Sequence, residues 1–402
     1  MANSMQTNKK TIALALGAVT EMSYLYAGAD KGIETEMQGK DNGDTIYYKI
    51  TQLGDPECDE VSQDGTGTAI ASASAIKQVT VPVKTLDSKI MIGVNAYERQ
   101  VTSLGGDEAK IRARIGQKVG KKAVSKVIDR DVESVGNVFV ATQDNAFATF
   151  QKAGAFLKGH VEGTIYGWMD WQIWGDLTGK GQQAVPCALA ETRFGKDLKG
   201  SWTLIDQLRV TSAISTFTAP ATLVSSGATA SVTGNTIKIK GTISKGDMFT
   251  IEGVYARDVN DNPTNQLYVF KASKAISSAS AETDVTDSIS NVDYGNVDDS
   301  VKATAWIAPE TVSSAAVKSV LVAGKTYAAC LIRTEGAQAF GVMKNCGCEG
   351  AKYEKSEIDG VIVHINSGED IGNFKTDKRF DMLFASKLVE PRAAAIVLYP
   401  LG

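Results

Sequence analysis

One stretch of the chain has the periodicity of an unusually long helix. Residues 105–136 read GGDEAKIRARIGQKVGKKAVSKVIDRDVESVG. Their apolar residues recur along one helix face, at Ile111, Ile115, Val119, Ala123 and Val127. Acidic residues at the start and Gly136 after the end are typical of helix termini. A helix over residues 107–135 is about 43 Å long at 1.5 Å per residue, so we expect a spine on which other parts of the chain pack.

The polar side of this predicted helix is basic. Eight Lys and Arg residues lie between Lys110 and Arg130, and Asp129 is the one acid among them. A solvated helix surface explains this pattern. Contact with an acidic neighbouring chain or with nucleic-acid phosphates explains it as well. The sequence leaves these alternatives open.

An extended hairpin precedes the helix. The segments TIYYKI, residues 45–50, and KQVTVPV, residues 77–83, alternate apolar and polar residues as strands do. The connection from Gly54 to Ala75 has few residues that could form a core. We therefore expect this excursion to project from the body and to need a partner to lie against.

The composition changes abruptly in the second half of the chain. Between Thr211 and Ser300, 25 of 90 residues are Ser or Thr, and alternating runs recur, as in TIKIK, FTIEGV and LYVFKA. This predicts an all-β module. After it, residues 308–324 begin at a proline and predict a return to helix. The chain as a whole is predicted to be α+β with an inserted β domain.

An oxygen-rich stretch lies inside the predicted β module. Asp258, Asn260 and Asn262 alternate as the ligands that open an EF-hand loop do. The sixth position is Pro263 rather than Gly, and the twelfth is Val269 rather than Glu, so the sharp bend and the two-oxygen ligand are missing. We interpret the stretch as a hairpin turn and predict no metal there.

Other patterns suggest little catalytic chemistry. GDLTGKG, residues 175–181, has three residues before Gly-Lys where a phosphate-binding loop has four. Cys346-Gly-Cys348 lacks the spacing and the partners of a zinc site, and the five cysteines form an odd set typical of reduced thiols in the cytosol. The two histidines, His160 and His364, have no nucleophile motif beside them. No catalytic, cofactor-binding or metal residue is predicted.

Three tryptophans fall at a spacing of three residues. Trp168, Trp171 and Trp174 are predicted to line one side of a short helix. Because no basic cluster flanks them, we favour a core or an interface over a platform on which bases stack.

The N-terminal segment and the overall charge limit the partners. Ile12, Leu16, Val19 and Met22 fall at helical spacing, which favours an amphipathic arm over a secretory signal. No run approaches the roughly 20 apolar residues of a membrane span. The net charge of −4 argues against a dedicated nucleic-acid reader.

Several segments, in their order along the chain, resemble the major coat proteins of short-tailed Salmonella-type phages, a branch of the Hong Kong 97 capsid fold. They are the Gly-Thr-x-Tyr stretch of residues 163–180, IDQLRV of residues 205–210, KGDMFTIEGV of residues 245–254, and the ending FASKLVEPRAAAIVLYPLG of residues 384–402. The insertion of about 90 residues looks shorter than is usual in that family.

The resemblance implies an organisation and a set of partners. The expected parts are an N-terminal arm (1–40), an extended hairpin loop (41–92), a peripheral domain with its spine helix (93–150), an axial domain (151–212 and 307–384), an inserted small β-barrel-like domain (213–306) and a C-terminal strand that returns to the peripheral domain (385–402). It implies self-assembly into hexamers and pentamers of an icosahedral virion shell in the host cytoplasm. A scaffolding protein and a portal protein would assist, and the shell would enclose double-stranded DNA without specificity.

Two other classes of function remain as alternatives. One is a secreted or surface binding protein with a β adhesin-like module. The other is an enzyme that depends on His160 or His364, although the sequence offers no frame for either.

Overall fold

A computed structural model places most of the chain. The residues it describes are 17–19, 22, 25, 28–33, 44–52, 77–84, 88–94, 108–161, 163–179, 198–202, 204–214, 216–297, 301–342, 352–358, 361–370 and 375–401. They form an α+β fold that consists mostly of strands, with three longer helices: α4 (Glu108–Ser134), α5 (Ala146–His160) and α6 (Trp171–Gly179).

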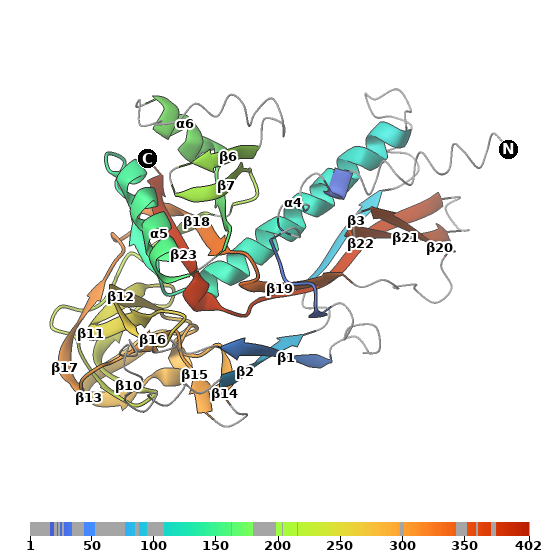
Figure 1. The fold of residues 1–402 in the computed structure, drawn as a ribbon. Coiled ribbons are helices and arrows are strands. Elements are labelled where there is room, and N and C mark those ends of the chain that lie inside the picture. Colours follow the sequence, from blue (N-terminus) through green and yellow to red (C-terminus); the bar gives the residue numbers. More distant parts are fainter. Residues whose placement is uncertain are drawn as a thin grey trace, which may run out of the picture.

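The described strands form four sheets, and two of them make the body and its long extension (Figure 1). The body sheet runs β4 (Val138–Val140), β23 (Ala394–Leu401), β18 (Thr326–Thr334), β5 (Ile165–Met169), β7 (Ile205–Val210) and β6 (Leu198–Trp202), and β8 (Thr216–Thr218) pairs with β18. The elongated sheet runs β19 (Gln338–Val342), β22 (Lys375–Leu388), β21 (Val361–Asp370) and β20 (Lys352–Ile358), and β3 (Ser88–Val94) pairs with β22.

The other two sheets lie below the body and the elongated sheet in the view of Figure 1. The larger one, which we call the β unit, runs β12 (Pro263–Lys271), β11 (Met248–Arg257), β17 (Val312–Ser319), β9 (Thr229–Thr233), β10 (Thr236–Ile243) and β13 (Ile276–Asp284), and β16 (Trp306–Ile307) pairs with β11. The smaller one runs β1 (Thr45–Gln52), β2 (Lys77–Lys84), β14 (Gly295–Val297) and β15 (Val301–Ala303).

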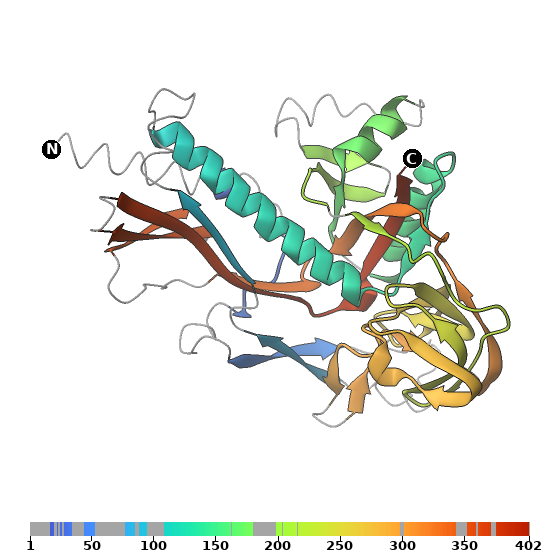
Figure 2. The ribbon, with the colours of Figure 1, turned by 180° about the vertical axis from the view of Figure 1, so that it is seen from behind.

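The predicted spine helix is confirmed. It was expected over residues 107–135, and α4 spans Glu108–Ser134. Its apolar stripe, for example Val119, Ala123 and Val127, is fully buried. The helix lies along the elongated sheet, against β22 and β3, and reaches from the tip of that sheet to the body (Figure 2). We call α4 and the elongated sheet together the arm.

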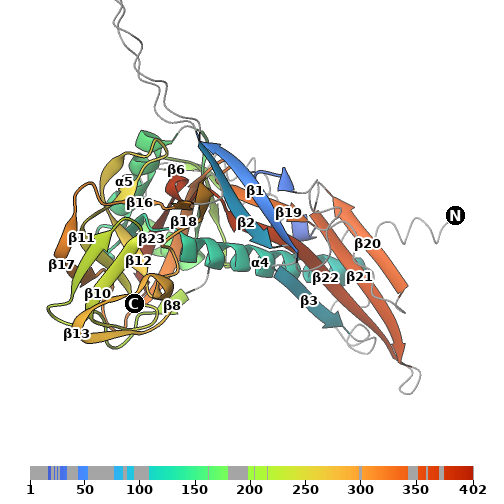
Figure 3. The same ribbon diagram turned by 90° about the horizontal axis from the view of Figure 1, so that it is seen from below.

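The predicted hairpin is also confirmed. β1 and β2 pair antiparallel over their full lengths, from Thr45 opposite Lys84 to Gln52 opposite Lys77. The connection from Gly54 to Ala75 lies outside the described residues. The two strands lie side by side (Figure 3). On its other edge β2 pairs with β14, where Thr80 lies opposite Asn296. The hairpin is therefore attached to its own chain through a strand that follows the β unit's β13.

The β unit has a core distinct from that of the body, and residues of the hairpin, such as Val79, and of the elongated sheet, such as Ala385, also pack in it. Phe249, Phe270 and Trp306 are buried in it, and the rings of Phe270 and Trp306 meet edge to face at 5.7 Å. The three strand predictions TIKIK, FTIEGV and LYVFKA fall on β10, β11 and β12 and are confirmed.

The predicted helix over residues 308–324 is wrong, because this segment contains strand β17. The strand lies between β9 and β11 and pairs with both. Val312 and Val317 are buried in the β unit, and β-branched residues suit such a surface. The pairing on both sides outweighs the helix-like proline start of the segment.

The tryptophan prediction is wrong in part. Trp168 lies on β5 and is 1% exposed, whereas Trp171 and Trp174 lie on α6. Asp170 separates the two elements, because its Oδ1 accepts a hydrogen bond from the Gln172 amide at 2.7 Å and so begins the helix. The three rings therefore do not share one helix face.

The described residues of the N-terminal segment agree with the amphipathic helix that was predicted there. Val19 and Met22 are helical and pack in the same core as α4, whereas Ile12 and Leu16 lie outside the described residues. Arg333 of β18 holds the segment that follows, because its guanidinium donates hydrogen bonds to the carbonyl oxygens of Leu25 (3.1 Å) and Gly28 (2.6 Å).

Candidate functional site

The oxygen-rich stretch is a closed hairpin turn between β11 and β12. Oδ1 of Asp258 accepts hydrogen bonds from the amides of Asn260 (2.9 Å) and Asn262 (2.8 Å), and the Asp258 amide donates to the Asn262 carbonyl at 2.9 Å. This is the use that an Asx turn makes of an aspartate. The predicted hairpin is confirmed, and the Asp258 oxygen is engaged by the chain itself.

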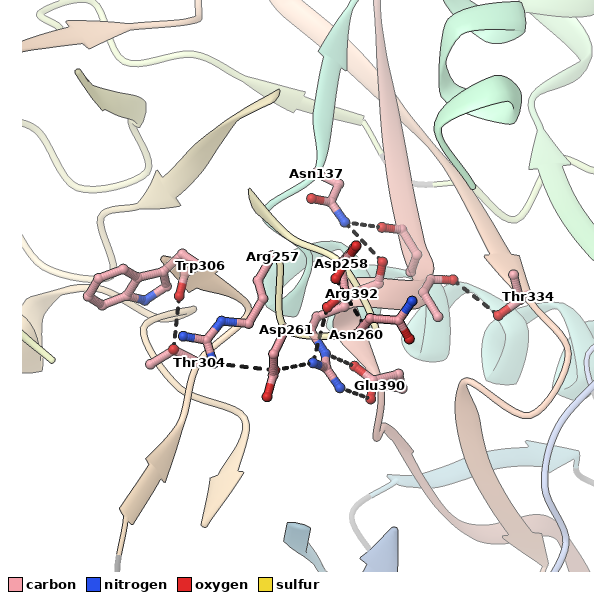
Figure 4. A network of polar contacts seen from close by, with 12 residues as sticks. Asn137, Arg257, Asp258, Asn260, Asp261, Thr304, Trp306, Thr334, Glu390 and Arg392 are labelled. Carbon is pink, nitrogen blue, oxygen red and sulfur yellow. Dashed lines mark hydrogen bonds and ion pairs between the residues drawn. The ribbon is translucent and has the colours of Figure 1, made fainter. Parts of the chain in front are cut away.

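The turn presents Asp261 to a buried arginine from the C-terminal segment (Figure 4). Arg392 is 1% exposed, and its Nη1 lies 2.7 Å from Oδ1 of Asp261. Both carboxylate oxygens of Glu390 accept hydrogen bonds from the same guanidinium, at 2.7 Å from Nε and 2.8 Å from Nη2. The backbone of Asp261 has φ of 70°, a left-handed conformation that costs free energy for a residue other than glycine.

These contacts keep the buried arginine charged. Burial alone would lower the pKa of Arg392, but its hydrogen bond with Glu390 and the charges of Glu390 and Asp261 raise it above its ordinary value. A buried ion pair adds little net stability compared with an apolar substitute. Removing one partner is nevertheless costly, because a buried charge is left uncompensated.

The end of α4 meets the same place. The Asn137 side chain donates to the carbonyl oxygens of Ala394 (2.9 Å) and Arg392 (3.3 Å). Its neighbour Gly136 accepts a hydrogen bond from the Val269 amide at 2.9 Å. A side chain at Gly136 would overlap the ring of Tyr268. The helix end, strand β12 and the C-terminal segment thus converge, and we call this place the joint.

Two buried ionisable groups flank the last turn of α4. Burial lowers the pKa of Lys271 to about 7, against the opposing charge of Glu133, and its Nζ donates to the Val132 carbonyl. Burial raises the pKa of Asp131 to about 7, although Arg333, Arg130 and the hydrogen bond from Gln338 oppose the shift. Gln338 Nε2 lies 2.7 Å from Asp131 Oδ2.

The histidines singled out in the sequence have structural contacts. His160 ends α5, and its Nδ1 lies 2.6 Å from the Phe156 carbonyl oxygen. His364 is buried on β21, with Nδ1 2.8 Å from the Tyr353 hydroxyl. These two contacts are to a backbone carbonyl and to a tyrosine hydroxyl, and burial raises the pKa of the Cys330 thiol to about 12.

The remaining candidates give no further site. Cys346 and Cys348, and the end of the GDLTGKG stretch, lie outside the described residues. Within the described part of the chain, no three His, Cys, Asp or Glu residues gather as a metal site would need. A helix long and apolar enough to cross a membrane is likewise not found in that part.

Sequence reasoning missed the residues of the joint. Glu390 and Arg392 stand in the ending EPRAAAIVLYPL, which entered the sequence argument only as a family pattern. A charged pair immediately before a strongly apolar strand is a signal of a buried ion pair. The sequence gives no sign, however, that its partner is Asp261, which lies 131 residues away.

Comparison with known proteins gives matches in structure only. No protein-family model matches the chain, and no curated protein matches its sequence. A structure of Mycobacterium phage Che8 is 12% identical, covers 92% of this chain and 88% of its own, and has a TM-score of 0.41. The capsid of Ralstonia phage GP4 is 9% identical, covers 93% and 87%, and has a TM-score of 0.43.

A third similar structure is the capsid of the cyanophage P-SCSP1u, 10% identical, with 90% of this chain and 84% of that chain covered and a TM-score of 0.39. Over nine tenths of its length or more, the chain is thus similar to solved phage structures.

Proposed function

We propose that this protein is the major capsid protein of a tailed phage, a subunit that assembles into the icosahedral shell around a double-stranded DNA genome. The observation that carries this proposal is the shape of the subunit. A 27-residue helix and the elongated sheet project together from the body, and the hairpin of β1 and β2 extends beside them (Figure 1). Such extended parts have much surface for their volume, and contact with neighbouring subunits would cover it.

The sheet edges support self-association. β1 is eight residues long and rich in β-branched and aromatic residues, and within the described part of the chain it pairs only with β2. An edge strand of this kind attracts another chain unless it is covered. Tyr47 on this strand is 64% exposed. In a shell, a neighbouring subunit would cover both the edge and this side chain.

We assign the parts of a Hong Kong 97-like subunit as follows. The arm is the peripheral domain with α4 as its spine, the hairpin is the extended loop, and the body sheet belongs to the axial domain. This differs from the expected boundaries, in which residues 307–384 belong to the axial domain and residues 385–402 return to the peripheral domain. Strands β19–β22 lie in the arm, and β23 pairs with β18 in the body sheet. We place the end of the inserted domain after Ser319 rather than at residue 306, because β17 lies within the β unit. The protein acts without catalysis, in hexamers and pentamers of the virion shell.

Assembly would take place in the host cytoplasm with a scaffolding protein and a portal protein. Electron microscopy of the full chain, purified alone and after co-expression with a scaffolding protein, tests the proposal. We expect closed shells of uniform diameter in at least one of the two preparations. Monomers alone, in both preparations and across a range of salt and protein concentration, would contradict it.

A further inference from the structure

The exposed side of α4 carries an unbroken series of cations. Lys110, Arg114, Lys118 and Lys122 follow one another at intervals of four residues, and all four are exposed. Lys121 lies beside them, exposed, and donates a 3.3 Å hydrogen bond to the Ser212 hydroxyl. We call these five residues the basic stripe.

The stripe is costly for an isolated helix. Like charges four residues apart face each other on a helix and destabilise it by about 0.2–0.5 kcal/mol per pair. No Asp or Glu occurs between Ala109 and Ile128, so the helix has no acid of its own to relieve the repulsion there. A solvated helix face usually mixes both signs of charge. An anion from outside the subunit would remove this cost.

The surroundings of the stripe indicate which anion fits. The large apolar side chains exposed in the described part of the chain are Tyr47, Trp171, Leu204, Val301 and Val322, and none of them lies on α4. A folded protein partner needs an apolar centre in its interface. A phosphate backbone needs only a row of cations.

The spacing also suits a nucleic-acid backbone. Four helical residues advance about 6 Å, so the stripe from Lys110 to Lys122 is about 18 Å long. DNA carries about one phosphate per 3.4 Å of each strand, so several phosphates lie within this length. Because the whole chain has a net charge of −4, attraction of DNA is confined to local patches such as this one.

We infer that the basic stripe contacts the phosphate backbone of packaged DNA, which makes this side of α4 the inner surface of the shell. The inference rests on the proposed function and adds an orientation to it. Since α4 packs on β22 and β3 with its other side, the elongated sheet faces away from the DNA. The contact is electrostatic and independent of base sequence.

Binding of a 30-base-pair duplex of arbitrary sequence to the purified full chain tests the inference. Each neutralised phosphate contributes about −0.9 to the slope of log affinity against log salt, so four contacts predict a slope of about −3.6. The affinity should then fall about 100-fold between about 50 and 200 mM salt. The variant R114Q/K118Q/K121Q/K122Q should lose most of this slope and bind at least about 10-fold more weakly at the lower salt.

A matched control removes the same charge elsewhere. Lys238, Lys240, Lys318 and Lys325 are exposed on the β unit or just after it, and K238Q/K240Q/K318Q/K325Q should keep the slope of the wild type. Folding is checked by thermal unfolding, where the stripe variant should melt no lower than the wild type because like-charge repulsion is removed.

Three outcomes would overturn the inference. They are absence of duplex binding by the wild type at low salt, equal slopes for the wild type and the stripe variant, and an equal loss in the control variant. A stripe variant that binds DNA normally but no longer forms shells would assign the stripe to an acidic protein instead. Shells from the wild type distinguish failure of this inference from failure of the proposed function.

Discussion

The β unit and the arm differ in how much of their surface the chain itself buries. The β unit buries its aromatic residues in a core that also receives apolar residues of the hairpin and of the arm, among them Val79 and Ala385. The arm is a single helix on a long, narrow sheet, and its exposed side carries like charges (Figure 2). We therefore expect the β unit to be stabilised by contacts within its own chain, whereas we expect the exposed side of the arm to depend on contacts with other molecules. The joint connects the two.

The largest expected effect concerns the core of the β unit. Trp306 is buried, and its Nε1 donates a 2.8 Å hydrogen bond to the Val292 carbonyl. Trp306→Ala should destabilise the protein by about 3–5 kcal/mol through the cavity it leaves. Urea unfolding measures the loss, and hydrogen exchange should increase in β9–β13 before it increases in the arm.

Trp171→Ala is the matched control for this substitution. Trp171 is 39% exposed, so its loss should cost much less than that of Trp306. Equal losses for the two variants, or a simultaneous increase of exchange in β20–β22, would show that the β unit and the arm unfold together.

A smaller effect is expected at the joint. Arg392→Met leaves Glu390 and Asp261 without their buried partner and should cost about 3 kcal/mol. Adding Glu390→Gln should restore part of the loss, because a largely buried carboxylate that has lost its partner is then removed. Urea unfolding of the single and double variants measures this coupling, and a double variant that is less stable than Arg392→Met contradicts the ion-pair account.

The long helix could be predicted from the sequence, but the joint could not. The apolar residues of α4 repeat with the helical period regardless of what packs on them, so its bounds were predicted to within one residue. Strand β17 was missed because its partners, β9 and β11, impose its conformation from elsewhere in the chain. The partners of Arg392 are fixed only by the tertiary fold.

The pH dependence of stability tests the burial of Asp131 in the last turn of α4. The pKa of Asp131 is raised to about 7 in the folded protein, from a usual value near 4. Between those values the folded protein holds a proton that the unfolded chain lacks, so stability should fall as pH rises, by up to about 1.4 kcal/mol per pH unit. Asp131→Asn should remove this slope. If stability depends on pH between 4 and 7 in the same way in the wild type and in Asp131→Asn, the buried position of Asp131 is contradicted.

The smallest effect is expected at the hairpin turn. Replacing Asp258, Asn260 and Asn262 by alanine removes the two side-chain hydrogen bonds of the Asx turn, at a cost of about 1–2 kcal/mol. We expect no response to calcium in the wild type or in the variant. Melting curves with and without calcium measure this, and a calcium shift that the substitutions abolish would make the turn a metal site.

The most direct test of self-assembly through extended parts is electron microscopy of a variant that lacks residues 54–75. The deleted segment connects β1 and β2 and belongs to neither strand. We predict that the wild type forms closed shells, whereas the variant remains a folded subunit, with an unchanged circular dichroism spectrum, that assembles poorly. Normal shells from the variant would contradict the role that we assign to the hairpin.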